Sequence, residues 1–248
     1  MREPDAPWGG LRAAIGLLTV LPGGGHPSSR AVRWFGPLGA AVGAAVGTAW
    51  WLAQRSVPWT VAAAIAVAVD LALTGFLHVD GLADSGDGLL PPLERARRLE
   101  VMAKPDTGAF GMALVVVVLL LRFAAFASMG ADPALVAALW VTARLVMAAT
   151  LGLVPPARAT GLTAPFRSRV ESMTAVVVGV PIAGVLVALS PLGAAGGLAA
   201  VAGAALAGGL VVGLARRRLG GYTGDVLGAA GLIAETVGLV VASGFAAG

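Results

Sequence analysis

The sequence predicts an all-α fold, a polytopic bundle of about seven transmembrane helices with a cytoplasmic N-terminus. Hydrophobic residues make up 58% of the 248 residues and charged residues only 12%, and the mean hydropathy is +0.88. Several apolar runs approach the roughly 20 residues that an α-helix needs to cross a bilayer. Glycines at positions 39, 43 and 47 repeat at the four-residue spacing that lets helices pack closely, which favours a helix bundle over a barrel.

Seven apolar segments are the candidate spans. They cover about residues 35–53, 57–77, 109–129, 133–154, 173–190, 193–214 and 226–246. A further apolar stretch, Leu11–Leu21, is too short to span, and a Pro-Gly-rich segment follows it instead of a small-residue cleavage site. A short interfacial or re-entrant helix is therefore favoured over a secretory signal. No domain boundary is visible, so we expect residues 1–248 to form a single integral membrane domain.

The basic residues indicate the topology. If the N-terminus is cytoplasmic, 14 of the 17 basic residues lie in cytoplasmic segments: Arg2, Arg12, Arg30, Arg33, Arg95, Arg97, Arg98, Lys104, Arg158, Arg167, Arg169, Arg216, Arg217 and Arg218. Only Arg55 lies outside, with Arg122 and Arg144 inside spans. This bias follows the positive-inside rule and places the loop 78–108 in the cytoplasm. The basic isoelectric point then requires no nucleic acid partner, because a basic cytoplasmic face suits anionic lipid or a phosphorylated substrate.

Three aspartates directly follow the second predicted span. If residues 80–87 are helical, Asp80, Asp84 and Asp87 fall at i, i+4 and i+7, within roughly 60° of one another at about 100° per residue. No basic residue between 75 and 94 would neutralise them. Carboxylates this close repel one another, and a divalent ion such as Mg²⁺, which prefers carboxylate and phosphate oxygens, would relieve the repulsion. The alternative is a polar loop of solvated aspartates.

Other polar residues lie on the same side of the predicted membrane as Asp80 and could converge with it. These are Arg144, Arg158, Asp106, Asp225 and Glu235. An intramembrane glutamate such as Glu235 is costly, so a functional partner is the default expectation. His78 could act as a base, support the carboxylates or simply lie at the interface. Arg122, in mid-span, is expected to pair inside the bundle, with Asp70 as the candidate partner.

Several common chemistries are excluded. The chain contains no cysteine, so thiol catalysis, iron–sulfur clusters and disulfides are ruled out. Its sole lysine, Lys104, is not in a P-loop context, and the zincin and serine-hydrolase motifs are missing. Metal-assisted chemistry on a phosphate or pyrophosphate at the membrane surface remains.

The acidic segment resembles the hallmark of the cobalamin synthase family, the membrane adenosylcobinamide-GDP ribazoletransferases. The family pattern Leu-Thr-Gly-Gly-x-His-x-Asp-Gly-Leu-Ala-Asp-x-x-Asp-Gly is matched by residues 73–88, with Phe76 as the visible change. Further matches occur at residues 35–39, 102–111, 143–144, 156–158, 161–162, 223–225 and 228–230, and at Glu235. The chain departs from the family pattern at two places. Leu232 stands where the family commonly has an acid, and residues 103–107 differ from the sequence that is commoner in the family.

The resemblance implies a late step of cobalamin biosynthesis. A ribose hydroxyl of α-ribazole, or of its 5′-phosphate, attacks the cobinamide-side phosphate of adenosylcobinamide-GDP; GMP leaves, and adenosylcobalamin or its phosphate forms. The implied enzyme is a Mg²⁺-dependent transferase in a prokaryotic cell (inner) membrane, with its site facing the cytoplasm. Which lower base is accepted and whether the chain forms a homo-oligomer stay open.

The resemblance also implies roles for the candidate residues. Asp80, Asp84 and Asp87 would bind the metal, or one of them would act instead as the base, with His78 as a further catalytic candidate. The candidates for substrate binding are Arg144, Arg158, Asp106, Asp225 and Glu235.

Two other classes stay open. A CDP-alcohol phosphotransferase also uses an Asp-Gly-x-x-Ala motif, but the Arg that usually follows it is Asp84 here. A membrane transporter would place ionisable residues near the bilayer midplane in broken helices, whereas most acids here cluster at one face.

Overall fold

The computed structural model describes residues 8–24, 26–158 and 163–246, so the sequence matches at Gly161 and Leu162 and the N-terminal Arg2 lie outside the described residues. The described chain is α-helical, apart from one isolated β-bridge between Pro156 and Tyr222. The α-helices are α1 (Gly9–Leu18), α2 (Phe35–Gln54), α3 (Trp59–Thr74), α4 (Leu77–Leu89), α5 (Arg95–Val101), α6 (Ala109–Ala127), α7 (Pro133–Leu153), α8 (Arg169–Leu189), α9 (Gly193–Leu219) and α10 (Gly224–Ala246). Two 3-10 helices, η1 (Ser29–Trp34) and η2 (Ala164–Phe166), precede α2 and α8.

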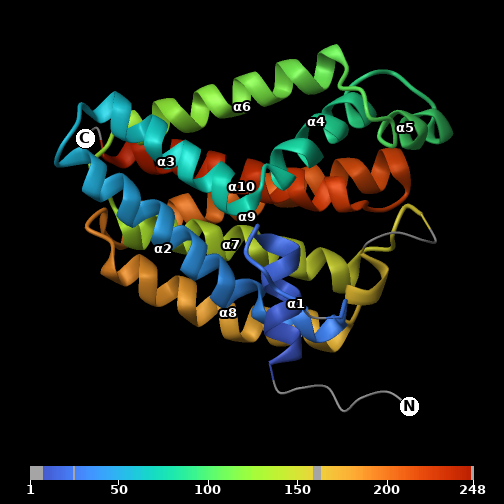
Figure 1. Cartoon of the computed structure of the whole chain (residues 1–248), viewed down its shortest axis with the longest axis horizontal. Coiled ribbons are helices and arrows are strands. Elements are labelled where there is room, and N and C mark those ends of the chain that lie inside the picture. Colours follow the sequence, from blue (N-terminus) through green and yellow to red (C-terminus); the bar gives the residue numbers. More distant parts are fainter. Residues whose placement is uncertain (1–7, 25, 159–162, 247–248) are drawn as a thin grey trace.

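The predicted membrane bundle is confirmed. Among the described residues, six helices are long and apolar enough to cross a membrane, and they contain α2, α6, α7, α8, α9 and α10. Helices α3 and α4 together make a seventh if the bent pair is one crossing. Figure 1 shows α6 and α8 along opposite edges of the bundle, with α7 and α10 between them. In their most apolar stretches 83% of α7 and 72% of α10 is buried, against 28% of α6, α8 and α9. The two central helices therefore form the core of the bundle.

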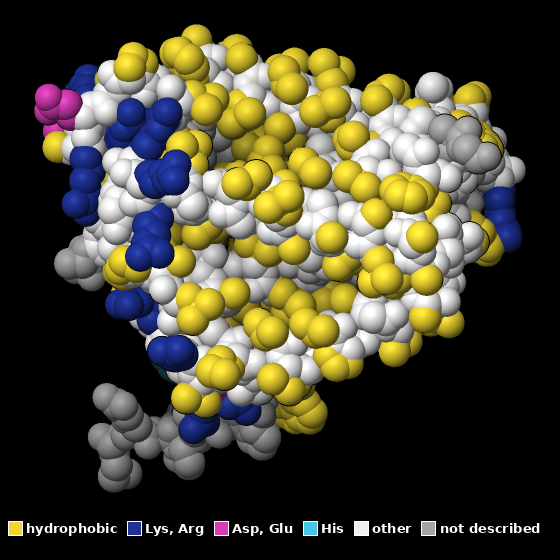
Figure 2. Space-filling model, turned by 180° about the vertical axis from the view of Figure 1, so that it is seen from behind, with side chains coloured by type: hydrophobic (Ala, Val, Ile, Leu, Met, Phe, Trp, Pro, Cys, Tyr) yellow, Lys and Arg dark blue, Asp and Glu magenta, His cyan; other side chains and the backbone are white. Residues whose placement is uncertain are grey.

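Lipid-facing and basic surfaces are separated. Figure 2 shows hydrophobic side chains across the middle of one face, with most Lys and Arg side chains gathered at one end. We call this the basic end; it is formed by α5, the start of α8 and the end of α9, with Arg95, Arg97, Arg98, Arg169, Arg216, Arg217 and Arg218. The N-terminal stretch forms the short helix α1, as predicted from its length.

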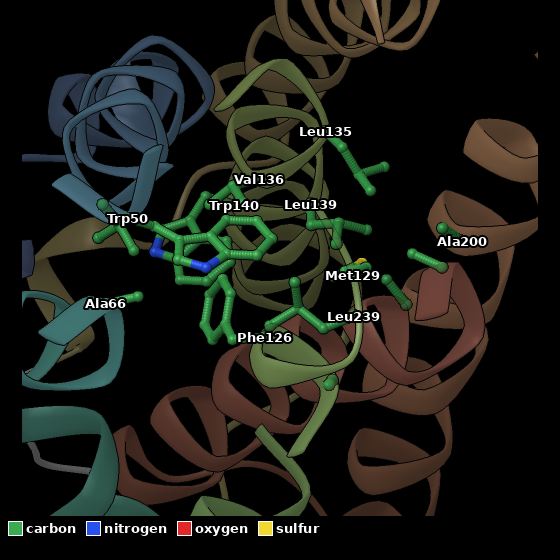
Figure 3. Packing of buried hydrophobic residues seen from close by; sticks show 14 of the residues in the cluster. Trp50, Ala66, Phe126, Met129, Leu135, Val136, Leu139, Trp140, Ala200 and Leu239 are labelled. Atoms are coloured by element: carbon green, nitrogen blue, oxygen red, sulfur yellow. The ribbon is translucent and has the colours of Figure 1, made fainter. Parts of the chain in front are cut away.

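The glycine repeat of α2 packs against α7. A Cβ at Gly39, Gly43 or Gly47 would lie 2.8, 2.7 or 2.6 Å from the nearest atom of α7, so the backbones approach closely only because no side chain is present. Next to this contact, Trp50 and Phe126 meet edge to face with ring centroids 4.8 Å apart. Figure 3 shows them with Trp140 in the buried core.

The second predicted span, 57–77, breaks where the prediction made it continuous. Helix α3 ends at Thr74, and α4 leaves it at an angle of 90°. Gly75 and Phe76 both adopt φ of 60°, in the left-handed region, and the carbonyl that α3 leaves free at Leu73 accepts a hydrogen bond from the backbone N–H of Val20 (2.9 Å). The segment 78–108 was predicted to be a cytoplasmic loop, and its aspartates were placed on one face on the condition that residues 80–87 are helical. Helix α4 covers these residues, and α5 follows it.

Single cysteines test the topology, because the chain has none of its own. Ser56 lies in the α2–α3 connection and Ala103 in the α5–α6 connection, and both are exposed. Cysteines at these positions should label from opposite sides of the membrane, with Ala103 on the side of the basic loops, which the charge bias predicts to be the cytoplasm. Labelling of both from one side would contradict the arrangement of the spans.

Replacement of Phe76 tests the strain at the break. A left-handed conformation costs an L-residue roughly 1–2 kcal/mol that glycine does not pay, and the Phe76 side chain is 57% exposed. We expect Phe76→Gly to stabilise the protein by about 1 kcal/mol in thermal unfolding of the detergent-solubilised chain. The matched control is Leu77→Gly at the first residue of α4, where φ is not left-handed, so this change relieves no strain and should not stabilise the protein. Destabilisation by both changes would contradict the strain.

Candidate active site

Helix α4 carries the acidic motif and runs between α10 and α6 toward α5 (Figure 1). Its glycines allow the close approach. A Cβ at Gly81 would lie 2.7 Å from the backbone oxygen of Asp225 on α10, and one at Gly86 would lie 2.9 Å from Cα of Gly111 on α6. The spacing of these glycines therefore brings α4 into backbone contact with two spans at once.

Asp80 and Asp84 share one face of α4 and meet Asp225 in the first turn of α10. Asp80 is exposed, and Asp84 and Asp225 are partly buried. The charges of Asp225, Asp80 and Asp87 all act on Asp84, so the carboxylates repel one another here. The Asp225 carboxylate also accepts a hydrogen bond from Thr223 Oγ1 (3.1 Å). We call Asp80, Asp84 and Asp225 the carboxylate cluster.

The third aspartate of the motif lies elsewhere on α4. Asp87 is buried, and its two carboxylate oxygens accept hydrogen bonds from the backbone N–H groups of Gly108 (2.5 Å) and Gly111 (2.9 Å) at the start of α6. The sequence placed Asp87 on the same face as Asp80 and Asp84, but packing against α6 gives it different partners.

Two arginines hold the other end of α4. Arg98 Nη1 donates to the backbone oxygens of Gly88 (2.7 Å) and Leu89 (3.1 Å). Arg218 Nη1 donates to the oxygens of Leu89 and Leu90. Burial, together with the charge of Arg218, lowers the pKa of the Arg98 guanidinium. Cations at the C-terminal end of a helix satisfy its free carbonyls and its dipole, so they stabilise α4 near the cluster. In the sequence, Arg98 and Arg218 indicated only the topology.

Arg158 follows α7 and lies close enough to Asp225 for its charge to act on that carboxylate. The β-bridge joins its segment to α10: Ala157 N–H donates to the oxygen of Tyr222 (2.8 Å). The Arg158 charge acts on Asp225, and its Nη2 donates to the backbone oxygen of Leu99 in α5. Within the described ranges Asp106 is exposed and has no hydrogen bond or ion pair with another predicted site residue.

His78 lies deeper than the cluster. It is buried, and a Cβ at Gly228 of α10 would lie 3.5 Å from its imidazole. Its Nε2 has no hydrogen-bond partner in the described part of the chain, and the charges of Arg144 and Arg122 act on it. His78 therefore faces the bundle interior, and its predicted catalytic role stays a prediction.

Arg122 is the centre of a buried ion-pair network. Its Nη2 donates to Asp70 Oδ2 (2.8 Å) and to Glu235 Oε2 (2.9 Å), which confirms the predicted Asp70–Arg122 pair. Asp70 also accepts a hydrogen bond from Trp140 Nε1 (2.9 Å), over whose ring the Arg122 guanidinium lies at 4.5 Å. The network joins α3, α6, α7 and α10.

Arg144 completes the network. Its Nη1 donates to Glu235 Oε1 (2.8 Å), and both side chains are 1% exposed. The network thus contains two guanidiniums and two carboxylates, and their charges balance. Arg144 and Glu235 meet each other rather than the carboxylate cluster, although Arg144 Nη2 has no partner among the described residues. Their predicted role in substrate binding stays a prediction.

Removal of Arg122 tests the network. Arg122→Met leaves Asp70 and one oxygen of Glu235 buried without a counter-charge, and breaking a buried pair from one side costs about 3–5 kcal/mol. Unfolding by SDS in mixed micelles should show this loss, and adding Asp70→Leu should recover part of it. The control is Arg55→Met at the opposite end, where Arg55 only stacks over Trp51. Equal stability of Arg122→Met and Arg55→Met would contradict the network.

Comparison with known proteins identifies the family. A family model described as cobalamin-5-phosphate synthase (CobS) matches residues 10–243. The chain is 35% identical over 249 residues to the adenosylcobinamide-GDP ribazoletransferase of Bradyrhizobium diazoefficiens, covering 96% of this chain and 94% of that protein. The ribazoletransferase of Ralstonia pickettii is 35% identical, with 92% of each chain covered. No solved structure matches. Because the match spans nearly the whole chain, this protein belongs to the cobalamin-5-phosphate synthase family.

Proposed function

We propose that the chain transfers the adenosylcobinamide phosphate of adenosylcobinamide-GDP to α-ribazole or its 5′-phosphate, with release of GMP. The observation that carries the proposal is the carboxylate cluster beside Arg158, in a chain whose relatives bear the ribazoletransferase name. That name favours this reaction over the CDP-alcohol phosphotransferase and the transporter alternatives. The proposed setting is a prokaryotic cell membrane with the basic end in the cytoplasm, as the positive-inside bias predicts.

The donor set of the cluster fits Mg²⁺. Asp80 and Asp84 are neighbours on one helix face, and Mg²⁺ is usually held by one or two carboxylates together with substrate phosphate oxygens. Among the described residues no group of three or more acidic, histidine or cysteine side chains is placed to hold a metal ion by itself, so an ion at Asp80 and Asp84 would need further ligands from substrate phosphates and water. Bound Mg²⁺ would neutralise pyrophosphate charge as the leaving group departs.

The side chains divide the remaining work. Arg158 is placed to donate to phosphate oxygens as charge grows on the departing GMP. A carboxylate of the cluster accepts the proton of the attacking ribose hydroxyl. Asp225, fixed by Thr223 at the start of α10, orients the acceptor.

Two donors test the reaction. Purified protein is incubated with α-ribazole, Mg²⁺ and either adenosylcobinamide-GDP or adenosylcobinamide phosphate. Only the first donor should yield adenosylcobalamin and GMP, because the second offers no good leaving group, and a chelator should stop the reaction. Equal cobalamin yield from both donors, or GMP release that ignores the chelator, would refute the proposal.

Asp84→Asn tests the metal site. The change keeps the size of the side chain and removes one charge, so the fold should survive while turnover falls by about 100-fold or more and the half-saturating Mg²⁺ concentration rises by about 10-fold. The matched control is Glu100→Gln, which alters only the exposed pair with Arg97. Its turnover and half-saturating Mg²⁺ concentration should equal those of the wild type. A folded Asp84→Asn protein with near-normal turnover would show that the cluster is not the catalytic centre.

A further inference from the structure

We propose that Asp87 is a positioning residue: it clasps α4 to the first turn of α6 and thereby aims Asp80 and Asp84, without itself binding the metal. This inference rests on the proposed function, because it divides the three acids of one motif between two roles. It departs from the expectation that all three aspartates are ligands.

The clasp replaces a missing helix cap. Gly108 is the N-cap residue of α6 and has no side chain to offer. The first four N–H groups of a helix have no partner inside it, and two of these orphan donors, at Gly108 and Gly111, are satisfied by the Asp87 carboxylate. A negative charge is also favoured at this end of the helix dipole. Asp87 thus caps α6 from a different helix.

Close packing holds Asp87 in this position. A Cβ at Gly108 would lie 2.5 Å from Asp87 Oδ1, and one at Gly111 would lie 2.4 Å from the backbone oxygen of Ala83 and 2.6 Å from Asp87 Oδ2. Both glycines therefore leave the space that the carboxylate fills. Along α4, exposure falls from exposed Asp80 through partly buried Asp84 to Asp87, whose residue is 7% exposed.

The clasp determines the orientation of the cluster. Helix α4 is held at three points. Its Asp87 binds the start of α6, its Gly81 packs against α10, and Arg98 of α5 binds its C-terminal end. Rotation of α4 about its axis would break these contacts and move Asp80 and Asp84 away from Asp225. Loss of the clasp should therefore lower turnover through the geometry of the site, whereas loss of a ligand should weaken metal binding.

Asp87→Asn and Asp84→Asn separate these roles. In nanodiscs, Asp87→Asn should speed amide hydrogen exchange at the start of α6 by about 10-fold, because the amide keeps one acceptor oxygen but loses the second acceptor and the negative charge. It should also lower kcat by about 10-fold or more while the half-saturating Mg²⁺ concentration stays within about 2-fold. Asp84→Asn should leave exchange at α6 unchanged and raise the half-saturating Mg²⁺ concentration. A Mg²⁺ shift in Asp87→Asn equal to that of Asp84→Asn, with unchanged exchange, would overturn the proposal.

Gly108→Ala covers the case in which Asp87→Asn does not fold. Its methyl group would displace the Asp87 carboxylate, although the chain keeps all of its acidic residues, so it should reproduce the fast exchange and low kcat at an unchanged Mg²⁺ requirement. Normal kcat and exchange in Gly108→Ala would contradict the clasp. If the wild-type protein forms no cobalamin from adenosylcobinamide-GDP and α-ribazole, the proposed function fails. The hydrogen-exchange measurement would still decide whether Asp87 caps α6.

Discussion

The fold depends on a balanced set of charges buried in the middle of the bundle. Arg122 and Arg144 share Glu235, and Arg122 also binds Asp70, so that two cations and two anions satisfy one another where lipid surrounds the helices. An unpaired charge at this depth would cost several kcal/mol. These ion pairs require one relative position of α3, α6, α7 and α10. They therefore determine how the helices that carry the site are arranged.

The geometry of the site follows from this arrangement of the helices. Helix α10 brings Asp225 to one side of α4, α6 presents its first turn to Asp87, and α3 leads into α4 through the break at Gly75 and Phe76. A helix that ends inside a membrane protein leaves carbonyls without partners. One of them is satisfied by Val20 after α1, which gives the short N-terminal helix a structural role next to the break.

Part of this arrangement could be predicted from the sequence, because it depends on local periodicity or on charge cost. The span positions, the packing of Gly39, Gly43 and Gly47 and the Asp70–Arg122 pair were predicted on those grounds. The helix break was not, because a continuous apolar run does not reveal that Gly75 and Phe76, near its end, adopt left-handed conformations. The mutual pairing of Arg144 and Glu235 and the capping of α6 by Asp87 join residues 91 and 24 positions apart, so helical periodicity alone could not separate Asp87 from Asp80 and Asp84.

The central claim is that Asp80 and Asp84 bind the metal while Asp87 positions them. A structure of the protein in nanodiscs with Mn²⁺ and adenosylcobinamide-GDP tests it most directly. We expect the ion between Asp80, Asp84 and the pyrophosphate oxygens, with the Asp87 carboxylate still on the N–H groups of Gly108 and Gly111. An ion coordinated by Asp87, with the start of α6 released from that carboxylate, would contradict the account.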